Sequence, residues 1–302
     1  MSFYNLHVHS LYSYKDALPS PLEIAKKNKE MGLNHFTITD HGSVGSWIAG
    51  FQAAEELEMQ FIPGIEIYLE NQDKTNKKQR YHHITAIAKN QIGLKNLIKL
   101  YNNSYIKWSK KITPKNILLE NHEGIILLSG CISGEPAYWL MNQQDDKVRN
   151  MLQEYKNVFK DDFYIELQYH GLTLDSPISE KEVYFKLQQF AKELNIQCVA
   201  TTDSHYLNKE DSLEHSLYKY IHYKDFTGKD YKYDYKKNTI EPAFNGSGYY
   251  MQTEQEAWGY IKNITQDYSA ITNSELIVNK CEKTHFPEAK PLKDMYNELH
   301  SL

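Results

Sequence analysis

The sequence has only three cysteines, Cys131, Cys198 and Cys281, spread along 302 residues. Thiols so few and so scattered exclude a disulfide framework and favour a reducing compartment. No apolar run approaches the length of a membrane span, and the first residues lack the charged and apolar regions of a signal peptide. We therefore expect a cytoplasmic protein without membrane contact.

An excess of positive charge is also missing. Lys and Arg number 34 against 39 Asp and Glu, which gives a net charge of −5. This balance excludes a protein that coats nucleic acid through bulk electrostatics, but it permits a nucleic-acid substrate held locally by metal ions. Hydrophobic residues make up 41% and charged residues 24% of the chain, as in an ordinary globular protein of one large domain or two small ones.

Short β-type runs alternate with longer amphipathic stretches. Helices are predicted at 21–31, 93–105 and 180–194, where apolar residues recur at helical spacing. The seven predicted strands are 4–9, 35–39, 61–68, 83–88, 124–129, 163–168 and 197–202. This alternation indicates a mostly parallel, barrel-like α/β fold, in which functional residues follow the C-terminal ends of the strands.

A pair of histidines near the start is the first chemical pattern. His7 and His9 lie two residues apart in a predicted strand, so both imidazoles face the same side. Alone this pattern is a weak signal, because a polar strand face produces it by chance. Imidazole and carboxylate together suit Zn, Mn or Fe, and several such groups from distant parts of a chain indicate a multinuclear site.

Other candidate ligands follow predicted strands, where a barrel places its chemistry. They are His41, Cys131, Asp203 and His205. Each candidate has a simpler interpretation: Cys131 as a small buried hydrophobe, and Asp16 as a turn residue. One such coincidence would favour the simpler interpretations, whereas five at strand ends favour a metal site.

Glu66 interrupts the apolar run 61–68, and a carboxylate in such a strand needs a partner to offset its desolvation. His83 begins its strand instead of following one. The polar segment 70–80 is predicted to form a hairpin loop, and antiparallel pairing would bring Glu66 roughly opposite His83. We therefore expect both residues in one site.

The order of these motifs resembles that of the PHP (polymerase and histidinol phosphatase) family. The segments that carry the resemblance to the N-terminal PHP domain of bacterial DNA polymerase III alpha subunits are Leu6-His-Val-His-Ser, Phe36-Thr-Ile-Thr-Asp-His-Gly, Gly124-Ile-Ile-Leu-Leu-Ser-Gly-Cys, Phe163-Tyr-Ile-Glu-Leu-Gln-Tyr-His-Gly and Val199-Ala-Thr-Thr-Asp-Ser-His-Tyr. The resemblance implies a distorted (β/α)7-type barrel. It predicts a PHP domain over residues 1–287, with a core at about 3–206, a peripheral segment 207–287 packed outside it, and an exit segment 288–302.

The resemblance also implies two to three divalent ions, Zn, Mn or Fe, held by nine residues. His7, His9, Glu66 and Asp203 would hold the first ion, and Glu66 would bridge to a second held by His83 and Cys131. Asp16, His41 and His205 would hold the third. Catalysis would depend above all on Glu66, Asp203 and His9. Many polymerase PHP domains lack some of these ligands, and retention of all nine is similar to members with metal-dependent 3′–5′ exonuclease activity.

We therefore expect a metal-dependent phosphoesterase that acts on DNA 3′ ends through metal-bound hydroxide. The alternatives are a small-molecule phosphatase of the histidinol-phosphatase type and a non-catalytic module that scaffolds a replicative polymerase in trans. The polymerase continues into palm, thumb and fingers domains, for which 302 residues leave no room. The sequence is thus expected to be a free-standing PHP protein, part of a split polymerase or an excised domain.

Two features at the edge of the predicted site have open interpretations. The basic stretch Lys107-Trp-Ser-Lys-Lys-Ile-Thr-Pro-Lys would suit a single-stranded end, with stacking on Trp108 and phosphate contacts from its lysines, or is a solvated loop. His170 and Tyr206 would bind phosphate or are simply residues of the rim, which we favour.

Overall fold

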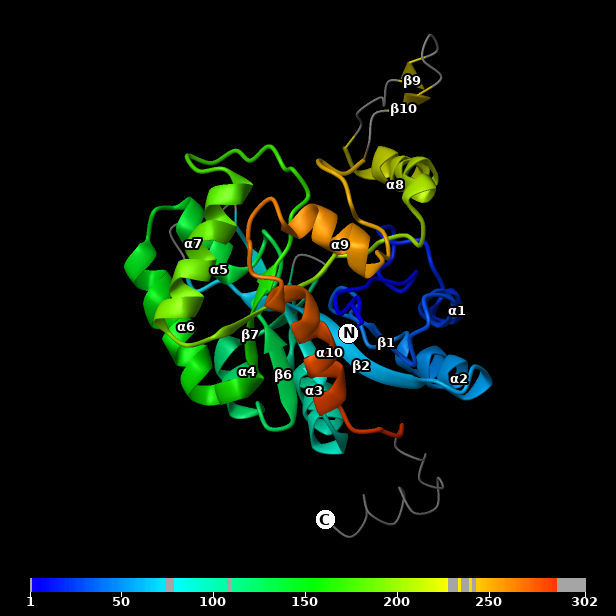
Figure 1. The fold of residues 1–302 in the computed structure, drawn as a ribbon, viewed down its shortest axis with the longest axis horizontal. Coiled ribbons are helices and arrows are strands. Elements are labelled where there is room, and N and C mark those ends of the chain that lie inside the picture. Colours follow the sequence, from blue (N-terminus) through cyan, green and yellow to red (C-terminus); the bar gives the residue numbers. More distant parts are fainter. Residues whose placement is uncertain are drawn as a thin grey trace.

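The computed structural model describes residues 2–73, 79–107, 110–227, 233–234, 239–240 and 243–286. Helices surround a mixed sheet (Figure 1). The strands are β1 (His35–Ile38), β2 (Gln60–Glu70), β3 (Tyr81–Ala88), β4 (Tyr105–Lys107), β5 (Lys110–Thr113), β6 (Ile125–Leu128), β7 (Phe163–Leu167), β8 (Gln197–Ala200), β9 (Tyr233–Asp234) and β10 (Thr239–Ile240). The α-helices are α1 (Pro21–Glu30), α2 (Trp47–Glu56), α3 (Gln91–Asn103), α4 (Lys115–Glu120), α5 (Glu135–Met141), α6 (Asp145–Phe159), α7 (Glu180–Glu193), α8 (Ser212–Thr227), α9 (Glu254–Ile261) and α10 (Ser269–Lys280).

The strands close into a distorted barrel. β1, β2, β3, β6, β7 and β8 follow one another around the sheet, and β3 runs antiparallel to both of its neighbours. The extended segment around Val8 completes the ring: Val8 bridges Ser204 in parallel beyond β8, and the Thr39 amide beyond β1 donates to the Val8 carbonyl oxygen at 2.7 Å. The predicted α/β barrel is therefore confirmed.

Local sequence signals account for several elements. Ser20 and Glu23 form a capping box at α1, with Pro21 in the first turn, and Ser179 and Glu182 form another at α7. The predicted helices 21–31, 93–105 and 180–194 correspond to α1, α3 and α7. Six of the seven predicted strands are present within a few residues of their expected ends. Segment 4–9 is different, because it forms only the isolated bridge at Val8.

The β2–β3 hairpin has a register other than the predicted one. Glu66 lies opposite Thr85, and His83 lies opposite Tyr68. Glu66 and His83 are thus diagonal neighbours on the same face, which is still within reach of long side chains. The hairpin prediction is confirmed, and the direct pairing is corrected.

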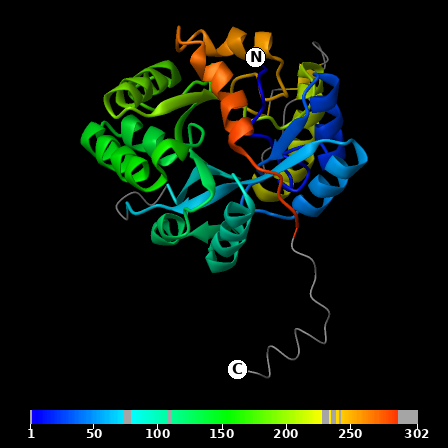
Figure 2. The ribbon, with the colours of Figure 1, turned by 60° about the horizontal axis from the view of Figure 1, so that its bottom comes forward.

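One end of the barrel is closed by α10. Ile277, Val278 and Cys281 belong to one buried cluster with side chains that alternate inward along the strands, such as Ile126 and Val199. In Figure 2, α10 lies across the middle of the ring of strands and helices. The expectation that the whole later segment packs outside the barrel is therefore wrong for α10, because its apolar side chains cover the barrel interior.

We expect Ile277→Ala to destabilise the fold by about 2–5 kcal/mol, because it leaves a cavity under a closed layer. Ile277 is fully buried, whereas its neighbour Leu276 is 49% exposed and provides a matched control. Urea unfolding of both variants measures the difference. Equal midpoints would show that α10 is not a closing layer.

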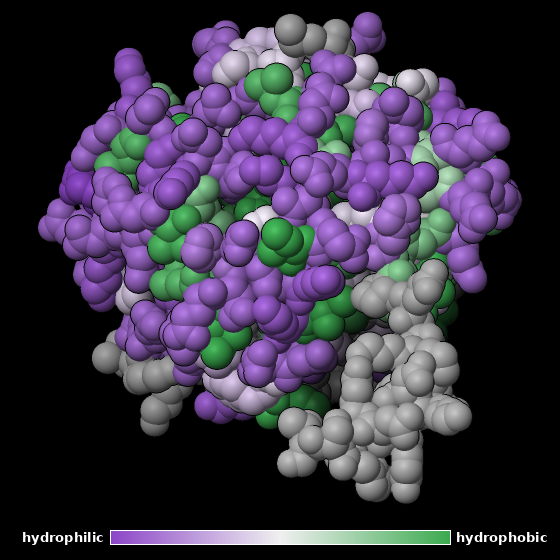
Figure 3. Space-filling model, turned by 90° about the horizontal axis from the view of Figure 1, so that it is seen from below, coloured by the Kyte–Doolittle hydropathy of each residue, from purple (hydrophilic) through white to green (hydrophobic). Residues whose placement is uncertain are grey.

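The surface in Figure 3 is mainly hydrophilic, with hydrophobic side chains scattered between polar ones. Scattered apolar residues of this kind are normal on a folded protein. Within the described part of the chain, every helix is too short or too polar to cross a bilayer.

Candidate metal centre

All nine residues that the sequence predicts as ligands meet at one end of the barrel. His7, His9 and Asp16 come from the N-terminal segment and the loop after it, and Glu66 and His83 come from β2 and β3. The remaining four, His41, Cys131, Asp203 and His205, follow β1, β6 and β8. Because β3 runs against its neighbours, the beginning of that strand lies at the end where the others finish.

The innermost part of the centre joins His7, His9, Glu66 and Asp203. His9 Nε2 lies 3.1 Å from His7 Nε2 and 3.0 Å from Asp203 Oδ1. His7 Nε2 lies 3.4 Å from Glu66 Oε1 and 3.3 Å from Asp203 Oδ1. Two ligands of one tetrahedral ion with bonds near 2.1 Å are about 3.4 Å apart, so this spacing fits a shared ion.

Glu66 connects this group to a second one. Its Oε1 atom lies 2.9 Å from His83 Nδ1 and 3.7 Å from Cys131 Sγ, and its Oε2 atom contacts His41 Nδ1. Cys131 Sγ and His83 Nδ1 are 3.6 Å apart. Oε1 thus faces donors of both the first and the second group, and Oε2 faces His41 and, at 3.7 Å, His9, so this carboxylate is placed to bridge two ions.

The third group contains Asp16, His41 and His205. Asp16 Oδ2 lies 2.8 Å from His41 Nε2 and 3.6 Å from His205 Nε2. The tightest sets of donor atoms, each within 4.8 Å, are His7–His9–Glu66, His9–His41–His205 and His41–Glu66–His83. These His and Glu clusters are consistent with a multi-metal site, although Asp16, Cys131 and Asp203 stand outside all three sets.

Hydrogen bonds fix which nitrogen each histidine presents. His205 Nδ1 donates to the Asp203 carbonyl oxygen at 2.8 Å, and His9 Nδ1 donates to Ser13 Oγ at 3.0 Å, since the Ser13 hydroxyl itself donates to Asp40. In both rings Nε2 is left with its lone pair toward the centre. His205 Nε2 is buried and has no hydrogen-bond partner among the described residues. This tautomer is the one that metal ligation requires.

Burial and neighbouring charges shift the titration of the centre. Burial raises the pKa of the Cys131 thiol, and Glu66 raises it further, so a bound ion must displace a proton to gain a thiolate ligand. Burial lowers the pKa of His9 to about 3, with help from His41 and His205. Burial alone would raise the pKa of Glu66, but the histidines around it, His83 first, hold that pKa well below its usual range.

Asp203 has a left-handed backbone, with φ of +46°. Residues other than glycine are uncommon there, and such conformations gather at functional sites. The bridge between Val8 and Ser204 holds this turn, because the Ser204 amide donates to the His7 carbonyl oxygen at 3.0 Å. The same backbone contact thus positions His7 and Asp203 together.

The prediction from sequence missed Glu166. This carboxylate on β7 is fully buried, and its Oε1 atom lies 2.6 Å from His7 Nδ1. Thr201 Oγ1 and the Gly130 amide also donate to it, at 2.5 and 3.1 Å. A carboxylate behind a ligating imidazole fixes the ring and raises its basicity. The available signal was the one used for Glu66, a carboxylate within an apolar strand.

Replacing Glu166 by glutamine is expected to weaken metal binding by about 10–100-fold, because the amide no longer holds His7 Nδ1 as an anionic acceptor. Titration against a chromogenic chelator measures this affinity. Glu135→Gln is the matched control, since Glu135 is also buried but binds Lys115 and Tyr155. An affinity unchanged in Glu166→Gln, or lost equally in both variants, would contradict this role.

Lys219 on α8 was also missed. Its side chain is 8% exposed and forms an ion pair with Asp16 Oδ1, while Asp16 Oδ2 faces His41 and His205. The Lys219 ammonium also lies 4.4 Å from the centre of the Phe244 ring. A resident cation beside Asp16 opposes a further positive ion at the third group.

We therefore expect Lys219→Met to tighten binding of the last ion by about tenfold or more, because one neighbouring positive charge is removed. Metal content at limiting free Mn or Zn, measured by mass spectrometry, checks this. Lys27→Met is the control, since Lys27 binds Asn208 on an exposed surface. A lower metal content in Lys219→Met would show that Lys219 supports the ion instead of opposing it.

The basic stretch forms a hairpin edge instead of a free loop. β4 pairs with β5, which pairs with β2. Lys110 Nζ donates to Tyr68 Oη at 3.0 Å, and the Tyr68 ring stacks on His41 with ring centres 5.8 Å apart. Trp108 lies outside the described residues. The ammonium group of Lys110 therefore stands beside the centre.

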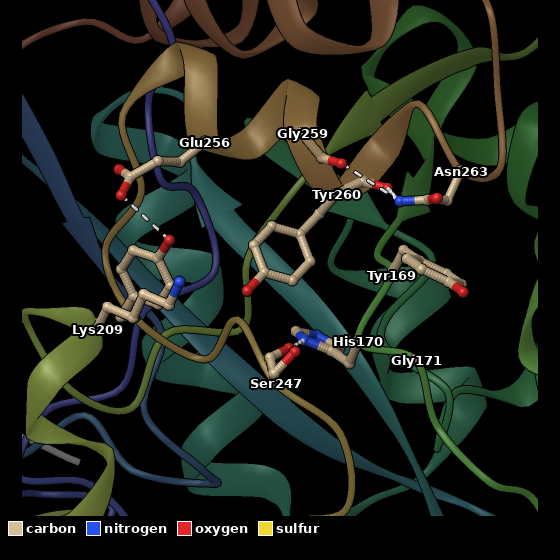
Figure 4. Close-up of a pocket in the computed structure, with 10 residues that line it drawn as sticks. Tyr169, His170, Gly171, Lys209, Ser247, Glu256, Gly259, Tyr260 and Asn263 are labelled. Atoms are coloured by element: carbon tan, nitrogen blue, oxygen red, sulfur yellow. Dashed lines mark hydrogen bonds between the residues drawn. The ribbon is translucent and has the colours of Figure 1, made fainter.

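His170 and Tyr206 are both buried. His170 lines a cavity of about 430 Å³ between the segment after β7, the chain before Tyr250, and α9 (Figure 4). Tyr206 packs with Tyr249 and Tyr250 and is not among the residues that line the cavity.

Known proteins are similar to this chain in sequence. A family model described as PHP domain matches residues 5–170. DNA polymerase III subunit alpha of Borreliella burgdorferi is 32% identical over 295 residues, which cover 94% of this chain and 24% of that protein. The same subunit of Campylobacter jejuni is 36% identical over 233 residues, which cover 72% of this chain and 19% of that protein. The chain thus spans about a quarter or less of these relatives.

Among solved structures, a two-domain protein from Bacteroides vulgatus, containing a predicted PHP-like metal-dependent phosphoesterase, aligns with a TM-score of 0.40. Its sequence identity is 17%, over 68% of this chain and 52% of that one.

Proposed function

Because the chain belongs to the PHP domain family, we propose that it is a metal-dependent phosphoesterase that removes nucleotides from DNA 3′ ends. The convergence of nine imidazole, carboxylate and thiol groups, with bridging geometry at Glu66, carries this proposal. When bound, clustered divalent ions supply hydroxide at neutral pH and stabilise the attacking and leaving oxygens of an in-line displacement.

Some residues of the centre are fully buried, and others are partly exposed to solvent. The side chains of His7, His9 and Glu66 are fully buried, whereas those of Asp16 and His83 are 21% and 17% exposed. The buried groups suit tight and fixed ligation, and the exposed ones leave a side from which a phosphoester can approach. Glu166 and the Ser13–Asp40 pair hold His7 and His9 in place while this happens.

Two observations support DNA as the substrate. The similarity is to DNA polymerase III alpha subunits, over 94% of this chain in one of them. Lys110 lies beside Tyr68, whose ring stacks on His41, and it offsets the acidic net charge locally. A positively charged edge beside a metal centre suits a strand that ends there.

Digestion of a 5′-labelled primer by metal-analysed protein, with Mn or Zn added back, tests this function. We expect a ladder that shortens from the 3′ end and stops at a 3′-terminal block. Release of phosphate from a small monoester without any cleavage of DNA would favour the phosphatase alternative. Bound metal without cleavage of any phosphoester would favour a scaffold for a replicative polymerase.

A further inference from the structure

We propose that the cavity beneath α9 is a nucleoside-binding pocket, which seats the base and sugar of the nucleotide whose phosphoester reaches the metal centre. The inference rests on the proposed function for its second half, while binding of the nucleoside is independent of it. At about 430 Å³, the cavity has the size of a small-molecule site.

Aromatic rings make up much of the wall. Tyr169 follows β7, Tyr250 precedes α9, and Tyr260 lies in the last turn of α9. In Figure 4 the Tyr260 ring extends from the helix toward His170 and Ser247, and Tyr169 lies on another side. Gly248 allows this placement, since a Cβ atom there would come within 2.9 Å of the Tyr260 ring. Tyrosine faces of this kind stack on nucleobases of any sequence.

Polar groups face the same space. The hydroxyls of the half-buried Tyr260 and the exposed Ser247 make no hydrogen bond within the described residues, so both are open to a ligand or to water. His170 is 5% exposed, its Nδ1 donates to the Ser247 carbonyl oxygen at 2.8 Å, and its Nε2 has no partner in the same part of the chain. A buried acceptor without a partner and two accessible hydroxyls between aromatic walls match a ligand that is flat and rich in hydrogen-bonding groups.

The tautomer of His170 determines that the ligand must offer a hydrogen-bond donor to Nε2. Burial lowers the pKa of His170 to about 4, so the ring is neutral near pH 7. With the proton on Nδ1, Nε2 is a hydrogen-bond acceptor and can bind an N–H or O–H donor of the ligand. Lys209 and Glu256 add one charge of each sign at the lining. A nucleoside offers amino and hydroxyl donors beside carbonyl and ring-nitrogen acceptors, which matches this mixed set.

One tyrosine ring separates the pocket from the metal centre. The Tyr249 ring stacks on His170, with centres 4.0 Å apart and planes at 7°. The other edge of the same ring lies against the ligand candidate His205, with centres 6.1 Å apart. The pocket residue His170 and the ligand candidate His205 therefore contact the same tyrosine ring, which places the pocket next to the metal centre.

Calorimetric titration of the full chain with deoxyadenosine, which carries no phosphate, tests the pocket. We expect Tyr260→Leu to weaken binding by about tenfold or more, because a stacking face is lost. Tyr260→Phe should have a smaller effect, and it keeps the test valid if the leucine variant folds poorly. Tyr268→Leu is the control, since Tyr268 is 40% exposed and does not line the cavity.

Hydrolysis separates this inference from the proposed function. For a thymidine 5′-phosphodiester we expect Tyr260→Leu to raise KM, while kcat for bis(p-nitrophenyl) phosphate, which has no base, stays unchanged. Absence of all hydrolysis with deoxyadenosine still bound would refute the phosphoesterase and leave the pocket supported. No binding of deoxyadenosine, or equal binding by wild type and Tyr260→Leu, would overturn the pocket.

Discussion

Asp203→Asn is expected to lower phosphoester cleavage by about a thousandfold or more and to reduce metal content, with the fold retained. Asp203 Oδ1 lies 3.0 Å from His9 Nε2 and 3.3 Å from His7 Nε2. Its negative charge would therefore bind directly the ion that these two histidines share. Asparagine has the same shape and tolerates the φ of +46° at this position. The loss is therefore one of charge and ligation, not of folding.

Single-turnover digestion of a 5′-labelled primer and metal analysis of the same sample measure both effects. Asp146→Asn provides the control, since the Asp146 side chain is 96% exposed on α6. Full activity in pure Asp203→Asn would point to a contaminating nuclease or to chemistry elsewhere on the chain.

Removal of metal is expected to abolish activity and to lower the free energy of unfolding by about 4 kcal/mol, if free metal stands at a thousand times its Kd. Without metal, the carboxylates of the centre do not only repel one another, because a charged histidine lies between them. Burial disfavours the charged form of His41, but Glu66 and Asp16 outweigh it and raise its pKa to about 10. The ring therefore stays cationic beside the carboxylates. The stability that is lost is the binding free energy of the ions, with the barrel core unchanged.

Urea unfolding of metal-loaded and chelator-treated protein tests this expectation, and Mn or Zn added back should restore both the midpoint and the activity. Protein treated with chelator that was saturated with Zn beforehand controls for effects of the chelator itself. Identical midpoints after verified removal of metal would mean that the ions add nothing to folding.

The sequence predicted the parts of the fold that depend on local periodicity. Helices α1, α3 and α7 have amphipathic spacing with capping signals at α1 and α7, and His41 and Asp203 stand directly after strands as a barrel requires. The placement of α10 was not predictable in this way, because an apolar stripe does not say which surface it covers. The register of β2 and β3 was not predictable either, because a shift of two residues keeps every side chain on the same face of the sheet.

Glu166 and Lys219 show a second limit. Each acts through a partner distant in sequence, His7 at a separation of 159 residues and Asp16 at 203. Residue spacing predicts which ligands share one strand. It does not predict which side chain of another helix or strand will contact them. Glu166 carried a signal that was visible in its apolar strand, whereas Lys219 looks like any other lysine of a helix.

The closure of the barrel by α10 has a consequence for how the protein is made. The Tyr4 amide donates to Ser274 Oγ at 3.0 Å across 270 residues, and Asn5 Nδ2 donates to the Gln252 carbonyl oxygen across 247. Contacts of such long range form late, because the loop between them must first be ordered. On the ribosome, His7 and His9 emerge long before α10, but the support of the segment that carries them is complete only after α10 has emerged. The candidate metal centre near the N-terminal segment therefore acquires its full support only after α10 has been translated.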